Sequence, residues 1–265
     1  MKLTTKSVAK VWGRSDLPPA LASLQTGEKL GEVWFDAPGR ELPILVKWIF
    51  TSEKLSVQVH PTDAQAHERG QPSGKEECWY ILDAEPGATL GLGTTEPMTG
   101  EELRAAALDG SIEDRMDWKP TRAGDFWSLA PGIVHAIGAG VTLIEVQQNA
   151  DITYRLYDYG RPRELHLDDG VTVSVAEPFP MARHSRPEPG PEPLVDGEHF
   201  RLWLREGVGA LDAIPDERPR WIVPVAGTAR VGKDAARPGE CLYAEAGAQA
   251  SVAADARVLV AMEAL

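Results

Sequence analysis

The types and spacing of Gln58, His60 and Glu77 are those of ligands for a metal ion. Apolar and polar residues alternate over residues 55–60, which predicts a strand with Gln58 and His60 on the same face. Pro61 ends this strand, because proline has no N–H to donate to a neighbouring strand. One face of a predicted sheet thereby presents an amide and an imidazole two residues apart.

The chain returns as a second alternating run over residues 75–82, after a loop with several Gly and Pro residues. Lys75 and Glu77 share one face of this run. A Pro-Gly turn further on delivers His135 to the start of another predicted strand. With the pair on the first strand, Glu77 and His135 would complete a set of two nitrogens and two oxygens. That mixture suits Zn²⁺ or a neighbouring transition ion better than Ca²⁺, and it leaves an open position for water or a substrate oxygen.

Each candidate ligand alone would carry little weight. A single histidine on a strand is more often hydrogen-bonded structure or solvent-exposed than a ligand, and an isolated glutamate is usually solvated. We interpret the other four histidines in that ordinary way: His67, His166, His184 and His199. The joint placement of the candidate ligands on alternating strands is what indicates a metal.

The composition of the chain excludes some classes of protein. The 265 residues suffice for one large domain or two of ordinary size. A net charge of −13 and a pI of about 4.9 argue against a general polyanion binder, although a local cluster of Lys and Arg can still hold one phosphate. Cys78 and Cys241 lie far apart, which predicts no disulfide framework and a reducing compartment. Without an apolar signal region or a stretch of transmembrane length, we expect a cytoplasmic protein that binds neither nucleic acid nor membrane.

Many short strands between Gly and Pro turns predict an all-β protein of barrel or jelly-roll type. Helix-forming composition over residues 100–118, after Thr99 as an N-cap, predicts a short helical insertion. Residues 1–31 are expected to be irregular except for a short helix at 17–24. The segment 177–198, crowded with proline and charge, is the best candidate for a boundary before a second all-β part.

The two β parts resemble each other, and this suggests an internal repeat. Residues 124–135 begin with Gly-Asp, and residues 239–250 begin with Gly-Glu, each with a second glycine eight positions on. In this alignment His135 falls opposite Ala250.

A second pair of segments extends the repeat. Residues 79–81, Trp-Tyr-Ile, resemble residues 221–223, Trp-Ile-Val, and this alignment puts Glu77 opposite Pro219. The C-terminal copy is therefore expected to keep turns and strands and to lack every ligand, so that the chemistry belongs to the N-terminal copy.

Four segments resemble signature segments of type I mannose-6-phosphate isomerases, which are cupin-fold enzymes: LPILVKWIFTSEKLSVQVHP, GKEECWYIL, PGIVHAIG and NADITYRLYDYGR. GEVWF at 31–35 and VWG at 11–13 also resemble that family, and the match runs in order through about residues 10–165. The resemblance implies the short bacterial form, with two cupin-like jelly-roll barrels of which the C-terminal one is degenerate. It also implies a metal-binding catalytic domain at 1–165, and a linker with a degenerate β domain at 166–265.

Matched residue by residue, the resemblance implies one zinc ion per chain, or another divalent transition metal, on Gln58, His60, Glu77 and His135. It makes catalytic residues of Lys75, Glu145 and Arg155, and substrate-binding residues of Ser56, Arg155 and Arg161. The sequence departs from the family at Ala150, where relatives usually have serine, and this puts one pocket hydrogen bond in doubt.

The expected reaction is the interconversion of mannose 6-phosphate and fructose 6-phosphate through a cis-enediol. One group must move a proton between C2 and C1, while positive groups stabilise the enediolate or bind the phosphate. Glu145 is the first choice as base, because it lies two strand positions from Gln147 on an inward face. Lys75 stays open as an alternative base if its pKa is strongly lowered, and Arg155 offers the better geometry for a phosphate.

Two other functions are weighed against this one. A cupin oxygenase with redox-active iron commonly presents two histidines one residue apart, whereas this chain has Gln58 and His60. A non-catalytic metal- and sugar-binding cupin would not need Lys75, Glu145 and Arg155. The partner expected is a small phosphorylated sugar, and the pattern leaves the preferred sugar and the oligomeric state open.

Overall fold

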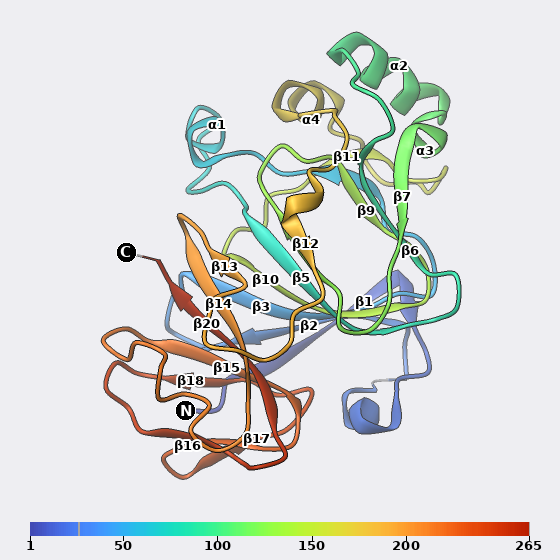
Figure 1. The fold of residues 1–265 in the computed structure, drawn as a ribbon. Helices are drawn as coiled ribbons and strands as arrows, with labels where there is room; N and C mark the ends of the chain where they lie inside the picture. Colours follow the sequence, from blue (N-terminus) through green and yellow to red (C-terminus); the bar gives the residue numbers. More distant parts are fainter. Residues whose placement is uncertain (26, 265) are drawn as a thin grey trace. The chain divides into compact units, whose positions relative to one another are not determined.

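The computed structural model describes residues 1–25 and 27–264 and contains four β-sheets, with helices confined to short segments (Figure 1). The all-β prediction is confirmed. Hydrogen-bond pairing leaves each sheet with two edge strands in the described part of the chain. The sheets are open, as in a double-sheet jelly roll, and no closed barrel forms among the described residues. No helix among these residues combines the length and apolar character needed to cross a bilayer.

The chain divides into two compact units. We call residues 11–13 and 49–185 the site unit, and residues 1–10, 14–48 and 186–265 the terminal unit. These bounds differ from the expected domains 1–165 and 166–265, which stay a prediction.

The site unit contains two β-layers and most of the helices. One layer includes the strand order β10-β5-β8-β12, and the other is β11-β4-β9-β6-β7. The strands are β4 (Val57–Val59), β5 (Glu77–Ala84), β6 (Thr89–Thr94), β7 (Met116–Pro120), β8 (Phe126–Leu129), β9 (His135–Ile137), β10 (Val141–Gln148), β11 (Tyr154–Tyr157) and β12 (His184–Ser185). The helices are α1 (Asp63–His67), α2 (Gly100–Asp109), α3 (Ile112–Arg115), α4 (Leu167–Val173) and the 3₁₀ turn η2 (Met181–Arg183).

The predicted helical insertion is present, but it is shorter than the pattern indicated. Thr99 forms a capping box at the start of α2, and Gly110 ends that helix in the left-handed conformation. After α3 the chain enters β7 at Met116, so the last part of the stretch 100–118 is a strand.

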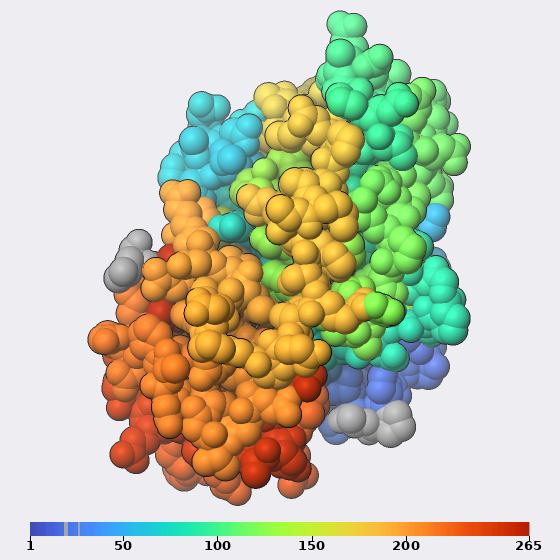
Figure 2. Space-filling model, viewed as in Figure 1, coloured from blue at the N-terminus to red at the C-terminus, as the bar shows by residue number. Residues whose placement is uncertain are grey.

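Apolar packing on one face of β4 orients its polar residue. Val57 and Val59 lie in an apolar cluster with residues of α2 and α4, such as Leu103 and Val173. Because side chains alternate along a strand, Gln58 faces the opposite way, toward the space between the two β-layers. In Figure 2 the yellow segment that carries α4 covers part of the visible face of the site unit, beside the cyan α1 and the green α2.

The terminal unit holds the C-terminal strands and the start of the chain. One sheet has the order β13-β14-β20-β15-β18 and another the order β17-β16-β19. The strands are β13 (Val195–Asp196), β14 (Phe200–Glu206), β15 (Arg220–Ala226), β16 (Ala229–Val231), β17 (Asp234–Ala236), β18 (Leu242–Ala244), β19 (Ala250–Val252) and β20 (Arg257–Glu263), preceded by most of β1 (Thr4–Arg14), η1 (Pro19–Leu24), β2 (Leu30–Asp36) and most of β3 (Ile44–Phe50).

The irregular start expected for residues 1–31 is wrong over Thr4–Arg14, which form the long strand β1. Most of β1 is exposed, and it pairs antiparallel with β2 through its backbone. A solvent-exposed strand that is held by backbone hydrogen bonds to its neighbour needs no alternation of apolar residues. Its sequence therefore gives little indication that it is a strand. The short helix expected at 17–24 is present as η1.

Candidate metal centre and active site

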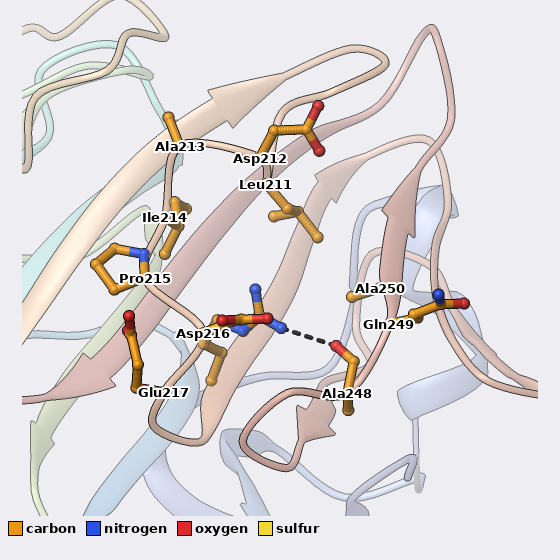
Figure 3. A pocket seen from close by; sticks show the side chains of 11 residues that line it. Leu211, Asp212, Ala213, Ile214, Pro215, Asp216, Glu217, Ala248, Gln249 and Ala250 are labelled. Carbon is orange, nitrogen blue, oxygen red and sulfur yellow. Dashed lines mark hydrogen bonds between the residues drawn. The ribbon is translucent and has the colours of Figure 1, made fainter.

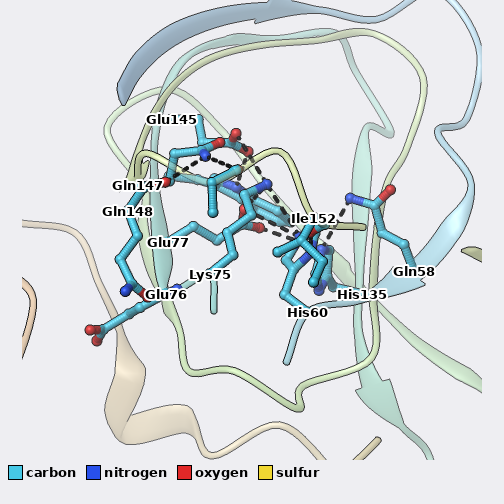
Figure 4. Close-up of polar contacts among 12 residues, drawn as sticks. Gln58, His60, Lys75, Glu76, Glu77, His135, Glu145, Gln147, Gln148 and Ile152 are labelled. Atoms are coloured by element: carbon cyan, nitrogen blue, oxygen red, sulfur yellow. Dashed lines mark hydrogen bonds and ion pairs between the residues drawn. The ribbon is translucent and has the colours of Figure 1, made fainter. Parts of the chain in front are cut away.

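His60, Glu77 and His135 form a buried cluster inside the site unit (Figure 4). One ligand atom from each lies within 4.8 Å of the others, and each side chain is at most 2% exposed. Glu77 Oε2 is 3.5 Å from His60 Nε2, and Glu77 Oε1 is 3.4 Å from His135 Nε2. Strands β5 and β9 deliver the glutamate and the second histidine, and the end of β4 delivers the first.

Backbone carbonyls fix the orientation of both imidazole rings. His60 Nδ1 is 2.8 Å from the carbonyl of Ile152, and His135 Nδ1 is 2.8 Å from the carbonyl of Ile133. Because a carbonyl only accepts, each Nδ1 carries the proton and each Nε2 keeps its lone pair toward Glu77. This is the arrangement that orients metal-bound histidines in proteins.

The carboxylate of Glu77 is incompletely satisfied within the protein. Neither of its buried oxygens has a partner that meets hydrogen-bond geometry, although Lys75 Nζ lies 2.7 Å from Oε2. Burial alone would raise the pKa of Glu77, but the charge of Lys75 and the contacts with His60 outweigh burial and hold this pKa well below its usual value. The residue is thus a buried anion whose oxygens are available to a cation.

Both histidines are neutral in this environment. Burial, followed by the positive charge of Lys75, lowers the pKa of His60 to about 4. The pKa of His135 is also lowered, chiefly by burial. Neutral imidazoles are the form that binds metal ions. Two neutral imidazole nitrogens and an ionised carboxylate are a donor set that fits a divalent transition ion.

Gln58 lies beside this cluster and needs one adjustment to act as a ligand. Its Nε2 is 3.3 Å from His135 Nε2, and its Oε1 accepts a hydrogen bond of 3.2 Å from Ser56 Oγ. Turning the amide by a half-rotation would present Oε1 to the centre, because the two ends of the amide have nearly the same shape. Ser56 is therefore placed as the neighbour of Gln58.

Lys75 and Glu145 extend the cluster along the same face of the sheet. Lys75 Nζ is 3.3 Å from His60 Nε2 and 3.6 Å from Glu145 Oε1. Glu145 is directly opposite Trp79 across β10 and β5, and the indole N–H of Trp79 donates to Glu145 Oε2 at 3.1 Å. The predicted inward face of Glu145 is thus confirmed.

A close approach of two loop segments places Lys75 next to His60. The Lys75 N–H donates to the carbonyl of Pro61 at 3.1 Å. A Cβ on Gly74 would overlap the backbone of Pro61 to Asp63, so only glycine permits this approach. The side chain of Asp63 accepts from the Gly74 N–H at 2.7 Å and from Gln148 Nε2 at 3.0 Å.

The structure leaves Arg155 and Arg161 outside direct contact with the cluster. Arg155 is opposite Gln58 across β11 and β4, so both side chains start on the same face. Its Nη1 donates to the carbonyl of Glu164 at 2.7 Å, and its buried Nε has no partner among the described residues. Arg161 lies over the ring of Tyr159 and donates to the Lys54 carbonyl.

The sequence patterns did not identify the positioning residues of this site. Trp79, Asp63 and Gln148 each hold a part of the site through one or two hydrogen bonds, and so do the carbonyls of Ile133 and Ile152. A carbonyl has no signature in sequence, and Trp79 reads as an ordinary core residue. Gly74 was the one available signal, as a glycine immediately before three charged positions.

The fold and this centre define a class of protein: a cupin-type β-sheet protein with a buried His-Glu-His cluster. The fold is that of the crystal structure of the mannose 6-phosphate isomerase from Bacillus subtilis, with a TM-score of 0.77, 22% identity and coverage of 98% of both chains. An arginine-to-alanine mutant of phosphomannose isomerase from Salmonella typhimurium matches with a TM-score of 0.73 and 15% identity, over 100% of this chain and 99% of that one.

Curated relatives carry the same name. The mannose-6-phosphate isomerase of Streptococcus mutans serotype c is 32% identical over 64% of this chain and 59% of its own length. Mannose-6-phosphate isomerase ManA of Bacillus subtilis is 41% identical over 56% of this chain and 48% of its own length. The chain thus spans about half of the length of these relatives. No family model matches the sequence.

Proposed function

We propose that the chain is a metal-dependent aldose–ketose isomerase that interconverts mannose 6-phosphate and fructose 6-phosphate. The observation that carries this proposal is the juxtaposition of His60, Glu77 and His135 with Lys75 and Glu145 in one buried cluster. Similarity to proteins named mannose-6-phosphate isomerase supports the choice of substrate.

The metal ligands in this proposal are His60, Glu77, His135 and the amide oxygen of Gln58, and the metal is Zn²⁺ or another divalent transition ion. When bound, such an ion supplies Lewis-acid stabilisation of negative charge on sugar oxygens. Two backbone carbonyls hold the imidazoles of His60 and His135 in place, whereas Gln58 must first turn its amide.

Glu145 is proposed to move the proton between C1 and C2 of the sugar. Its Oε2 is fixed by Trp79, while its Oε1 faces Lys75. A side chain that is 4% exposed loses few protons to solvent, so the proton taken from one carbon can be returned to the other.

Lys75 is proposed to stabilise negative charge on the enediolate. Its ammonium group lies among Glu77, Glu145 and His60, with Nζ 2.7 Å from Glu77 Oε2. Donors on a positively charged side chain, held in a water-poor site, act more strongly than they would in water.

Arg155 and Arg161 are proposed to bind the phosphate. The side chain of Arg155 starts on the same sheet face as Gln58, and its Nε–H has no acceptor among the described residues. The buried Nη1 of Arg161 also has no acceptor among these residues. Arginine matches the geometry of a phosphate with paired donors.

A coupled assay that follows fructose 6-phosphate formation from mannose 6-phosphate tests the proposal. The protein should be inactive after removal of metal and should regain turnover when Zn²⁺ is added. Undiminished turnover after metal removal would exclude a metal-dependent reaction. Sugar-phosphate binding without product, at full metal loading, would instead support a non-catalytic binding protein.

A further inference from the structure

A cavity of about 490 Å³ in the terminal unit is not used by the proposed isomerase reaction. Figure 3 shows its walls, with the chain from Leu211 to Glu217 on one side and the chain from Ala248 to Ala250 on the other. Arg220, the first residue of β15, also lines it.

Strand pairing shows that this cavity occupies the position in the terminal unit that is equivalent to the His60, Glu77 and His135 cluster of the site unit. Glu77 on β5 is opposite Leu129 on β8, and His135 follows Leu129 by six residues. In the terminal unit Arg220 is opposite Ala244 on β18, and Ala250 follows Ala244 by six residues. The register thus puts Arg220 in the position of Glu77.

The neighbouring strands confirm this equivalence. Glu77 is opposite Gln147 on β10, and Arg220 is opposite Met262 on β20. His135 is opposite Leu92 on β6, just as Ala250 is opposite Val231 on β16. The expected alignment of Glu77 with Pro219 is therefore wrong by one residue. The similar segments Trp79–Ile81 and Trp221–Val223 led to that alignment, but a shift of one residue along a strand moves a side chain to the opposite face of the sheet.

Among residues 1–25 and 27–264, no acidic group pairs with the buried guanidinium of Arg220. It is 4% exposed, and its strand neighbours Ala244 and Met262 belong to the apolar cluster of the terminal unit. Its only hydrogen bond in the described chain runs from Nη2 to the carbonyl of Ala248 at 2.9 Å, and its buried Nε–H has no partner. A buried guanidinium without an anion is costly, so an acceptor with negative charge is the missing group.

The rim of the cavity restricts which anion can enter. Asp212, Asp216 and Glu217 line it and are exposed, and none of them pairs with Arg220. The negative charges of these three residues repel a phosphate dianion more strongly than they repel a ligand with one carboxylate. They also accept hydrogen bonds from hydroxyl or ammonium groups.

We propose that this cavity binds a small organic monocarboxylate that also carries hydroxyl or ammonium groups. Its carboxylate accepts the hydrogen bonds that Arg220 offers, and its donors face the three rim carboxylates. Hydroxy acids and amino acids share this chemistry.

Titration calorimetry on the full chain with three probes tests the proposal: D-gluconate, L-serine and inorganic phosphate. We expect gluconate or serine to bind one site and phosphate to bind at least roughly tenfold more weakly. The probe that binds identifies the source, a hydroxy acid or an amino acid. Failure of both organic acids to bind would overturn the proposal, and so would tighter binding of phosphate that Arg220→Met abolishes.

Two variants locate the binding. Arg220→Met should weaken binding of the organic acid by roughly tenfold or more, since a charge-assisted hydrogen bond is lost. Arg218→Met, which removes a nearby arginine outside the cavity lining, should leave the affinity unchanged. His60→Ala should also leave it unchanged, and loss of binding in that variant would place the acid in the metal cluster and refute the assignment.

Discussion

The two β units use the same pairing scheme to build different interiors. In the site unit β10-β5-β8 forms one layer and β9-β6-β7 belongs to the other, and in the terminal unit β20-β15-β18 and β19-β16-β17 repeat these two groups. The equivalent inward positions hold a glutamate, a glutamine and a histidine in one unit, and an arginine, a methionine and an alanine in the other: Glu77, Gln147 and His135, against Arg220, Met262 and Ala250.

The units also differ by two strands in one layer. In the site unit β4 and β11 extend the layer, and β4 carries Gln58 and leads into His60. In the terminal unit the chain between β14 and β15 has no strand and forms a wall of the cavity. The sheet framework is thus independent of the site. The added strand β4 and a few inward residues turn an apolar interior into a His-Glu-His cluster.

Removal of an imidazole should have the largest effect. We expect His60→Ala and His135→Ala to reduce isomerase turnover by roughly a thousandfold or more, because loss of the metal removes several kcal/mol of charge stabilisation. The coupled assay and metal analysis of the purified protein measure this. His67→Ala, at an exposed histidine of the same unit, should retain both metal and turnover. Bound metal and full turnover in the His60 variant would contradict the view that this cluster sets the chemistry of the site unit apart from that of the terminal unit.

Neutralising Lys75 should have the next largest effect. Lys75→Met should lower kcat by roughly a hundredfold to ten-thousandfold, the range for one positioned catalytic group, while the metal content stays the same. Lys119→Met provides the control, since Lys119 pairs with Asp117 on β7, outside the cluster. Equal kcat values for the two variants would show that Lys75 has no role beyond folding.

Acid should destabilise the metal-free site unit before the terminal unit. The pKa of His60 is lowered to about 4, so the unfolded chain binds a proton that the folded chain does not. The contribution of His60 to the free energy of unfolding is therefore fully present above about pH 6.5. It is lost as the pH falls toward 4, by about 3 kcal/mol in total. The low pKa of Glu77 acts in the same direction at lower pH.

Hydrogen exchange resolves this effect by strand. Amides of β5 should lose protection between pH 6.5 and 4, whereas those of β15 should change less. The same loss in β15 would show that the histidines are not its source.

Replacement of Arg220 should have the smallest effect. In ligand-free protein, Arg220→Met should change the free energy of unfolding by less than about 1 kcal/mol or raise it, because an unpaired buried charge is exchanged for an apolar side chain of similar length. Thermal unfolding of the two proteins measures this. Strong destabilisation would mean that the guanidinium holds the unit together through its bond to Ala248, as a purely structural residue.

Much of the framework and the site was predictable from local patterns. Alternation predicted β4 and β5, the N-cap Thr99 predicted α2, and the Pro-Gly turn predicted His135 at a strand start. The structure brings His60, Glu77 and His135 together as expected, with the expected residues Lys75 and Glu145 beside them. The metal-ligand and catalytic roles of these residues stay predictions.

What escaped prediction depends on neighbours that are distant in sequence. Strand β1 is held by a ladder on an exposed surface, and the carbonyls that orient the two histidines have no side-chain signature. The sequence placed Pro219 opposite Glu77 because similar Trp-containing segments dominated the alignment.

The amino-acid sequence by itself determined the all-β class and the chemical types on the inward faces, because the period of two along a strand is a local property of the backbone. Only the tertiary structure decided which inward residues meet. The register between strands gives Arg220 in the terminal unit the position that Glu77 has in the site unit. The packing of β4 against residues of α2 and α4 turns Gln58 inward. Register and packing are set by pairing across the whole sheet, so no single segment contains them.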